Sequence, residues 1–210
     1  MKILLIGCSG FIGNELVPYL IKEGCKLTVV SRKSNVFYKD ALNQEQIIHI
    51  QTDPSKPQSW ETPELSKALK EATVVVNLAG EPIADKRWGK KHCQQLIDSR
   101  INTTKYLTRA MNNLTKPPHT LINGSAIGFY GTSLEKTFTE NSTSGEDFLS
   151  NLCTQWESCA EEKPKRTRLI IFRISIVLGQ DGGALGKMMP VFKAGFGGPI
   201  GNGKQWMSWI

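Results

Sequence analysis

The sequence feature that most constrains the fold is a glycine-rich heptapeptide close to the N-terminus. The apolar run of residues 2–6 leads directly into Gly7-Cys8-Ser9-Gly10-Phe11-Ile12-Gly13, and a helical pattern follows at once. Glycines at such a corner let the chain turn sharply, let backbone amides approach a ligand, and let the helix pack closely on a sheet. The helix N-terminus adds unpaired N–H groups and the positive end of its dipole. The pattern predicts a corner that binds a diphosphate; the alternative is a tight turn without a ligand.

Apolar runs and helical patterns alternate along the rest of the chain. The runs, which are typical of buried strands, span residues 2–6, 26–30, 47–50, 73–77, 120–123 and 169–174. Helical patterns span residues 11–23, 64–71, 91–113 and 146–161, and a further helix begins near Ala184. Alternating strands and helices predict parallel pairing, and runs that are apolar throughout indicate burial on both faces. We therefore predict an α/β fold of the Rossmann type, a doubly wound parallel sheet with helices on both faces.

In such a fold the glycine-rich loop binds the pyrophosphate of a dinucleotide, and the residues after the second strand indicate which one. The expected loop contacts are Gly7, Ser9, Gly10, Phe11, Ile12 and Gly13. Proteins that bind NAD usually place an acid about 20 residues beyond the glycines, on the ribose 2′-hydroxyl. This chain instead has Ser31-Arg32-Lys33, and a guanidinium matches a phosphate bidentately. The pattern favours NADP(H) over NAD(H), with Ser31, Arg32 and Lys33 at the 2′-phosphate; the alternative is a solvated turn.

Further candidate cofactor contacts follow the third and fourth expected strands. Asp53 either contacts the adenine amino group or forms a turn before a proline. The segment Leu78-Ala79-Gly80 ends the fourth strand at the carboxyl edge, where doubly wound sheets bind ligands, and its small residues let a cofactor lie against backbone. Arg100 lies in the long helix and faces either the cofactor or solvent.

Composition narrows the choice of partner and compartment. The formal net charge is +7, but the basic residues form short clusters without interleaved aromatic residues, so we expect no nucleic-acid partner. No run approaches the about 20 apolar residues that span a bilayer, so no membrane partner is expected. The five cysteines lack a CxxC pair, which favours a reducing cytoplasmic or plastid-like compartment. The three histidines have no metal-ligand spacing, so no metal is assigned.

The C-terminal end of the sequence departs from the pattern. Residues 194–203 are rich in glycine, and residues 205–210 stop in what resembles the start of a new strand. A natural domain boundary would close with a capped helix or a polar tail. We expect a truncated chain, with a NADP-binding Rossmann domain over residues 1–180 and the start of a substrate-binding region over residues 181–210.

The order of motifs is similar to one atypical branch of the extended short-chain dehydrogenases/reductases, the NAD-dependent epimerase-like family. The resemblance covers the whole chain and rests on residues 7–13, 77–88, 125–131, 147–157, 177–183 and 197–210. It implies a nicotinamide cofactor and an oxidoreductase or epimerase that acts on a small oxygenated substrate, such as a nucleotide sugar. Some members carry labels that link them to cell or plastid division. The resemblance also implies a further substrate-domain segment after Trp209-Ile210.

The catalytic dyad that is usual in that superfamily is missing. Ordinary members use Tyr-x-x-x-Lys on the helix after the fifth strand, where the tyrosine exchanges a proton with the substrate oxygen. No lysine stands four residues after any of the four tyrosines, Tyr19, Tyr38, Tyr106 and Tyr130. Alignment on Glu157 places Leu149 and Cys153 at the dyad positions, and neither side chain can perform that proton transfer at neutral pH.

A few polar residues remain as candidates for the chemistry. Ser125 ends the fifth strand, at the place of the superfamily's substrate-orienting serine. Tyr130 is a candidate stand-in acid, and the alternative is a packed aromatic residue with a satisfied hydroxyl. Arg173 lies inside the apolar sixth strand, where a charge is costly unless paired, so a carboxylate or a ligand phosphate is expected beside it. Arg87 and Trp88 either overhang the nicotinamide or form a surface turn.

Two functions stay open at this point. The first is an NADP(H)-dependent oxidoreductase or epimerase whose proton comes from an unconventional acid, from water or from the substrate. The second is a nucleotide-sensing or interaction protein that keeps the cofactor pocket without turnover, as the missing dyad suggests. The fold alone does not choose between them, because function depends on the site.

We predict that Arg32→Asp weakens the binding of NADPH more than that of NADH. The introduced carboxylate repels the 2′-phosphate but accepts a hydrogen bond from a 2′-hydroxyl. Fluorescence titration with the two reduced cofactors gives both dissociation constants. An equal loss of affinity for both would remove Arg32 from the 2′-phosphate.

Overall fold

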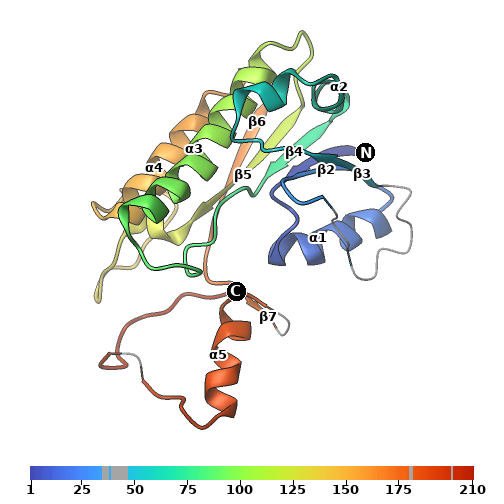
Figure 1. Ribbon diagram of the computed structural model, residues 1–210. Helices are drawn as coiled ribbons and strands as arrows, with labels where there is room; N and C mark the ends of the chain where they lie inside the picture. The colour runs from blue at the N-terminus through green and yellow to red at the C-terminus, as the bar shows by residue number, and fades with distance from the viewer. Residues whose placement is uncertain (35–37, 39–46, 180–181, 200) are drawn as a thin grey trace. The chain divides into compact units, whose positions relative to one another are not determined.

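Helices separate most of the strands along the chain, and six of the strands form one parallel sheet (Figure 1). The structure, a computed structural model, describes residues 1–34, 38, 47–179, 182–199 and 201–210. The strands of the sheet are β1 (Lys2–Ile6), β2 (Lys26–Ser31), β3 (Ile47–Gln51), β4 (Val74–Asn77), β5 (Thr120–Ala126) and β6 (Arg168–Ile174). Their order is β3-β2-β1-β4-β5-β6. The order reverses between β1 and β4, and doubly wound sheets bind ligands at the carboxyl edge of that point.

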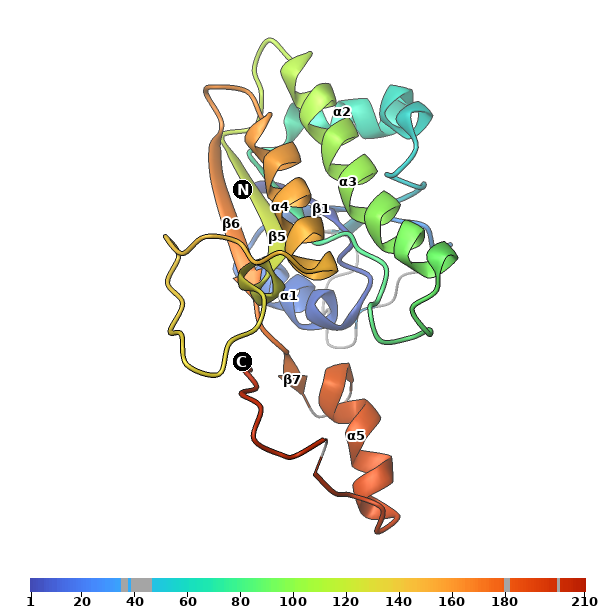
Figure 2. The same cartoon turned by 90° about the vertical axis from the view of Figure 1, so that its left-hand side faces the viewer.

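Helices cover both faces of the sheet, as Figure 2 shows for α1 on one face and α2 and α3 on the other. The α-helices that connect the strands are α1 (Phe11–Lys22), α2 (Pro63–Glu71), α3 (Lys90–Asn112) and α4 (Phe148–Glu161). Two 3₁₀ turns, η2 (Pro57–Glu61) and η3 (Ile127–Tyr130), lie between them. The predicted fold class is confirmed. One difference is that β5 continues to Ala126, beyond the predicted end at Asn123.

Alternation along the central strands divides the core into two layers. Leu4 and Ile6 of β1 point into a layer formed with α2 and α3, whereas Ile3 and Leu5 point into a layer formed with α1. These side chains are buried. Each such burial contributes about 1.5–3 kcal/mol, so β1 is held firmly on both faces. The corner that follows β1 therefore starts from a fixed position.

A buried polar network holds the chain where it leaves β4. Asn77 Nδ2 donates to Asn123 Oδ1 at 2.7 Å and to Thr104 Oγ1 at 2.9 Å. Asn77 Oδ1 accepts from the Ala79 N–H at 3.3 Å, and the Trp156 indole N–H donates to the same Thr104 hydroxyl at 2.9 Å. Both asparagines and the threonine are fully buried, so each polar group depends on these partners. The network ties β4 and β5 to α3 and α4 at the carboxyl edge.

The chain divides into two compact units. The first comprises Met1–Ser125 and Thr154–Phe172, and the second comprises Ala126–Cys153 and Arg173–Ile210. The second unit contains η3, the short strand β7 (Leu178–Gly179) and α5 (Gly183–Lys193), which is the helix expected near Ala184. This unit exposes large apolar side chains, among them Phe196, Trp206 and Trp209. Within the described parts of both units, every helix is too short or too polar to cross a bilayer.

We predict that Asn77→Ala lowers the free energy of unfolding by about 2 kcal/mol, because it leaves the Asn123 amide and the Ala79 N–H buried without this partner. Chemical denaturation monitored by circular dichroism measures the change. Asn14→Ala, at an exposed position on α1, is the control and should change the value by less than about 0.5 kcal/mol. Equal stability of the two variants would contradict the role of the network.

Candidate dinucleotide site

The three glycines of the first loop differ in whether the fold could accept a side chain at their positions. Gly7 has a φ of +77°, and a Cβ there would overlap the Ala79 backbone. Gly13 lies in the first turn of α1, and a Cβ there would overlap the Cys8 carbonyl group. Gly10 is the N-cap of α1, and a Cβ there would meet no atom within 4 Å. The fold thus requires Gly7 and Gly13, whereas Gly10 leaves open space at a helix N-terminus, where an anion is favoured.

Tyr38 anchors this loop from outside it, a role that no local sequence pattern indicates. Its hydroxyl donates to the Cys8 carbonyl oxygen at 2.9 Å, and its ring is buried in the α1 layer of the core. Burial raises the pKa of the Tyr38 hydroxyl above its usual value, so it remains a donor. Burial also raises the pKa of the Cys8 thiol to about 12. The loop is therefore fixed by neutral groups.

The chain that leaves β2 places two cations beside the loop. Lys33 Nζ donates to the Ser9 carbonyl oxygen at 3.3 Å. The Arg32 side chain is 63% exposed, and its guanidinium lies 3.2 Å from the Glu81 carboxylate. Ser31 is buried, and its hydroxyl lies 3.2 Å from the Lys33 carbonyl oxygen and 2.9 Å from His49 Nε2. Arg32 and Lys33 are thus exposed next to the loop, the Ser31 hydroxyl has protein partners, and contact of all three with a 2′-phosphate stays a prediction.

Arg100 supports the chain that leaves β4. Its Nη1 donates to the carbonyl oxygens of Glu81 at 3.1 Å and Leu96 at 3.2 Å, and its guanidinium lies 5.3 Å from the centre of the Trp156 ring. A Cβ on Gly80 would lie within 3 Å of the guanidinium, so a larger residue there would require the Arg100 side chain to move. These contacts direct Arg100 at protein groups, and its predicted contact with a cofactor stays a prediction.

Leu78 and Asp53, two further residues predicted to contact the cofactor, form hydrogen bonds within the protein. Leu78 donates its N–H to the Ile6 carbonyl oxygen at 2.8 Å, so the predicted segment Leu78-Ala79-Gly80 runs beside the start of the glycine loop. Asp53 Oδ1 accepts from the Ser55 N–H at 3.0 Å and from the Ser55 hydroxyl at 2.7 Å. This is the geometry of a turn former, one of the two interpretations of Asp53, and an adenine contact stays a prediction.

A buried serine–glutamate pair stands at the end of β5. Ser125 Oγ donates to Glu157 Oε1 at 2.5 Å, and both residues are less than a tenth exposed. Glu157 comes from α4, 32 residues along the chain, and no local pattern indicates the pairing. A serine hydroxyl that donates to a carboxylate still has lone pairs with which to accept a hydrogen bond. The pair can therefore hold a substrate hydroxyl through Ser125.

In the second unit, Tyr130 and Arg173 form an aromatic and cationic cluster. Arg173 Nη1 donates to the Tyr130 hydroxyl at 2.9 Å and to the Glu140 carbonyl oxygen at 3.1 Å. Its guanidinium lies 3.5 Å from the centre of the Phe129 ring, and Tyr130 stacks on Phe138. The predicted partner of Arg173 was a carboxylate or a phosphate. The structure adds a hydroxyl, a carbonyl oxygen and an aromatic ring face, and a planar guanidinium can bind each of these.

Leu149 and Cys153 of α4, which the resemblance places at the dyad positions, both lie close to Gly128. Leu149 Cβ and Cys153 Sγ lie 3.3 and 4.0 Å from the place that a Cβ on Gly128 would take. All three residues belong to the second unit. The close packing of Gly128 against α4 gives both side chains a structural role.

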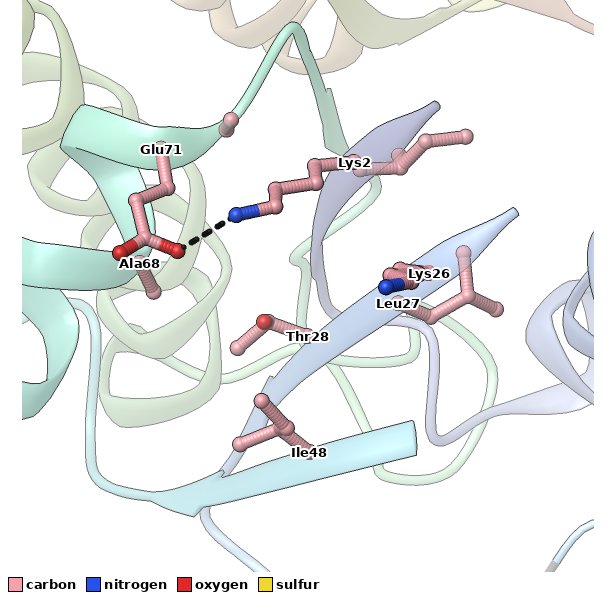
Figure 3. A pocket seen from close by; sticks show the side chains of 9 residues that line it. Lys2, Lys26, Leu27, Thr28, Ile48, Ala68 and Glu71 are labelled. Atoms are coloured by element: carbon pink, nitrogen blue, oxygen red, sulfur yellow. Dashed lines mark hydrogen bonds and ion pairs between the residues drawn. The ribbon is translucent and has the colours of Figure 1, made fainter. Parts of the chain in front are cut away.

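A pocket of about 310 Å³ lies at the other end of the sheet (Figure 3). It is lined by the starts of β1 and β2, by Ile48 and by the end of α2, where Lys2 Nζ lies 2.9 Å from the Glu71 carboxylate. None of the predicted site residues lines it. Among the residues that the structure describes, no three histidines, cysteines or acids gather into a metal-binding group.

Comparison with known proteins identifies the family. A sequence model described as the NAD dependent epimerase/dehydratase family matches residues 3–210. The chain belongs to this family. It is 37% identical over its full length to the chloroplastic epimerase family protein SDR39U1 homolog of Arabidopsis thaliana, and it covers 58% of that protein. It is 35% identical to human SDR39U1 and 37% identical to YfhF of Bacillus subtilis, and it covers 66% of each. The chain thus spans less than two thirds of the length of these curated relatives.

Solved structures agree with this assignment. The crystal structure of human SDR39U1 isoform 2 with NADPH matches all of this chain and 65% of the human chain, with a TM-score of 0.83 and 34% identity. A nucleoside-diphosphate sugar epimerase from Corynebacterium glutamicum matches all of this chain and 41% of its own, with a TM-score of 0.78 and 29% identity. The predicted resemblance to the extended epimerase-like family is confirmed.

We predict that Gly10→Val abolishes dinucleotide binding and leaves the fold intact, because the side chain enters open space at the helix N-terminus and displaces the pyrophosphate. Gly89→Val is the matched control. Gly89 also caps a helix, α3, with a φ of −109° against −108° at Gly10, and a Cβ there also meets nothing within 4 Å. NADPH titration and thermal unfolding of both variants test this. Unchanged affinity in Gly10→Val would show that the loop is only a turn.

Proposed function

We propose that this chain binds NADP(H) at the carboxyl edge of its sheet and forms the cofactor-binding part of an oxidoreductase or epimerase. The observation that carries the proposal is the open position at Gly10, with Arg32 and Lys33 beside the same loop. Backbone amides at the start of α1 bind the pyrophosphate, and the two cations bind the 2′-phosphate. The NADPH in the crystal structure of human SDR39U1 supports this choice of cofactor.

The substrate of this proposal is a small hydroxyl or carbonyl compound of the nucleotide-sugar class. The name of the Corynebacterium relative supports that class. The bound cofactor supplies or accepts hydride, as nicotinamides do. Ser125 holds the substrate oxygen, and Glu157 fixes the orientation of the serine hydroxyl. Residues 1–180 form the NADP-binding domain and residues 181–210 begin the substrate-binding region, in a cytoplasmic protein that binds neither nucleic acid nor membrane.

A second function, a sensor that binds the cofactor without turnover, is favoured by one observation. Leu149 and Cys153, which the resemblance places at the dyad positions, pack against Gly128. Both functions require that the chain binds the cofactor, and they differ in whether hydride is transferred to or from a substrate.

Two measurements test the proposal in sequence. Titration of the purified chain with NADPH and NADH is expected to show binding, tighter for NADPH. No binding of either cofactor would overturn the proposal. The protein with NADP⁺ is then mixed with UDP-glucose and related nucleotide sugars. The absorbance of reduced nicotinamide reports net oxidation, and chromatography of the sugars reports epimerisation, which leaves the cofactor unchanged overall.

Turnover in the second measurement should fall about 10²-fold in Ser125→Ala while NADPH affinity is kept. Binding without any hydride transfer, in the wild type as in the variant, would favour the sensor. Equal turnover in both proteins would remove Ser125 from the reaction.

A further inference from the structure

An ion pair crosses the corner from which the glycine loop starts. Arg32 follows β2, and Glu81 follows β4 by four residues. These two strands flank β1 in the sheet, so a contact between the chains that leave them must pass over the carboxyl end of β1. Arg32 Nη2 lies 3.2 Å from Glu81 Oε2. The pair therefore spans the edge at which a dinucleotide is expected to lie.

Glu81 has a second cation as well as Arg32. Lys86 Nζ lies 3.1 Å from Glu81 Oε1, on the oxygen that Arg32 does not contact. The Glu81 side chain is only 16% exposed, whereas Arg32 is 63% exposed. The Lys86 ammonium, and after it the Arg32 guanidinium, hold the pKa of the Glu81 carboxyl below its usual value. The carboxylate is therefore charged at neutral pH and keeps a partner when Arg32 leaves.

The same guanidinium is the group that would bind a 2′-phosphate. Carboxylate and phosphate use the same planar arrangement of N–H donors, so the two anions compete for it. NADH has a hydroxyl at this position and does not compete. We propose that Glu81 is a specificity-determining residue that occupies Arg32 in the free protein and is displaced by the 2′-phosphate of NADP(H). Glu81 then lowers the affinity for NADP(H) relative to NAD(H). This inference rests on the proposed cofactor binding.

Lys86 makes the exchange possible. When the phosphate takes Arg32, the carboxylate turns wholly to Lys86 instead of losing its only charged partner. Without Lys86, Arg32 is the remaining cation of the two that pair with Glu81, so the ion pair between Glu81 and Arg32 becomes stronger. Lys86→Gln is therefore expected to weaken NADPH binding with little effect on NADH.

The test compares NADPH and NADH affinities in Glu81→Gln by fluorescence titration at low ionic strength, where exposed ion pairs are least screened. Affinity for NADPH is expected to rise about twofold to fivefold, the range for an exposed ion pair, and affinity for NADH to stay constant. Glu81→Asp keeps the charge but shortens the side chain by one methylene, so it should also raise NADPH affinity. If the effect came only from net charge, Glu81→Asp would bind NADPH as tightly as the wild type does, and that result would overturn the inference.

Two controls complete the experiment. Glu71→Gln removes one carboxylate from the remote pair with Lys2 (Figure 3) and should change neither affinity. In an Arg32→Ala background, Glu81→Gln should have no effect, because the competition needs the guanidinium. Equal gains for both cofactors, or a gain that persists without Arg32, would overturn the role of Glu81. A wild type that binds no NADPH would overturn the proposed function instead.

Discussion

The whole carboxyl edge of the sheet depends on two places where backbone meets backbone because no side chain is present. At Gly7 the start of the loop lies directly against the chain at Ala79, and at Gly13 the helix lies directly against Cys8. The first contact sets the distance between the ends of β1 and β4, and the second sets the direction of α1. A methyl group at either position would move one of these elements. The groups that could bind a dinucleotide take their positions from this corner.

Neutral, buried groups fix this corner, and charged, exposed groups surround it. The Tyr38 hydroxyl donates to the Cys8 carbonyl oxygen after β1, and the Asn77 side chain accepts from the Ala79 N–H after β4. All four residues are buried, so water does not compete for these hydrogen bonds. Arg32 and Lys33 stand outside them and remain partly solvated. Neutral hydrogen bonds in the interior are insensitive to salt, whereas exposed ion pairs are screened. The buried groups thus set most of the geometry of the corner and the exposed cations set its charge, with Lys33 contributing to both through its hydrogen bond to the Ser9 carbonyl oxygen.

The sequence predicted the fold well because its signals are local. The runs in β1, β2 and β4 are largely apolar and buried, which makes them easy to see, whereas the edge strands β3 and β6 leave Ile48 and Phe172 exposed. The basic pattern Ser31-Arg32-Lys33 after the second strand extended the prediction to NADP(H), in agreement with the NADPH in the human relative. The glycine spacing located the corner, although it did not distinguish the glycines that the fold needs from the one that leaves space.

The functional pairings were less predictable because they join distant parts of the chain. Ser125 and Glu157 are 32 residues apart, Tyr38 and Cys8 are 30 apart, and Arg32 and Glu81 are 49 apart. Periodicity and propensity describe neighbours along an element and contain no information on such contacts. Arg100 shows the same difficulty, since its position in a helix left both the cofactor and solvent as partners, and the structure adds backbone carbonyl groups.

The burial of Cys8 has a consequence for how the protein withstands oxidants. Peroxides and alkylating reagents attack thiolates, and a thiol whose pKa is near 12 forms almost none at neutral pH. Cys8 is fully buried and behaves as a small apolar side chain, so the folded domain presents almost no Cys8 thiolate to such reagents.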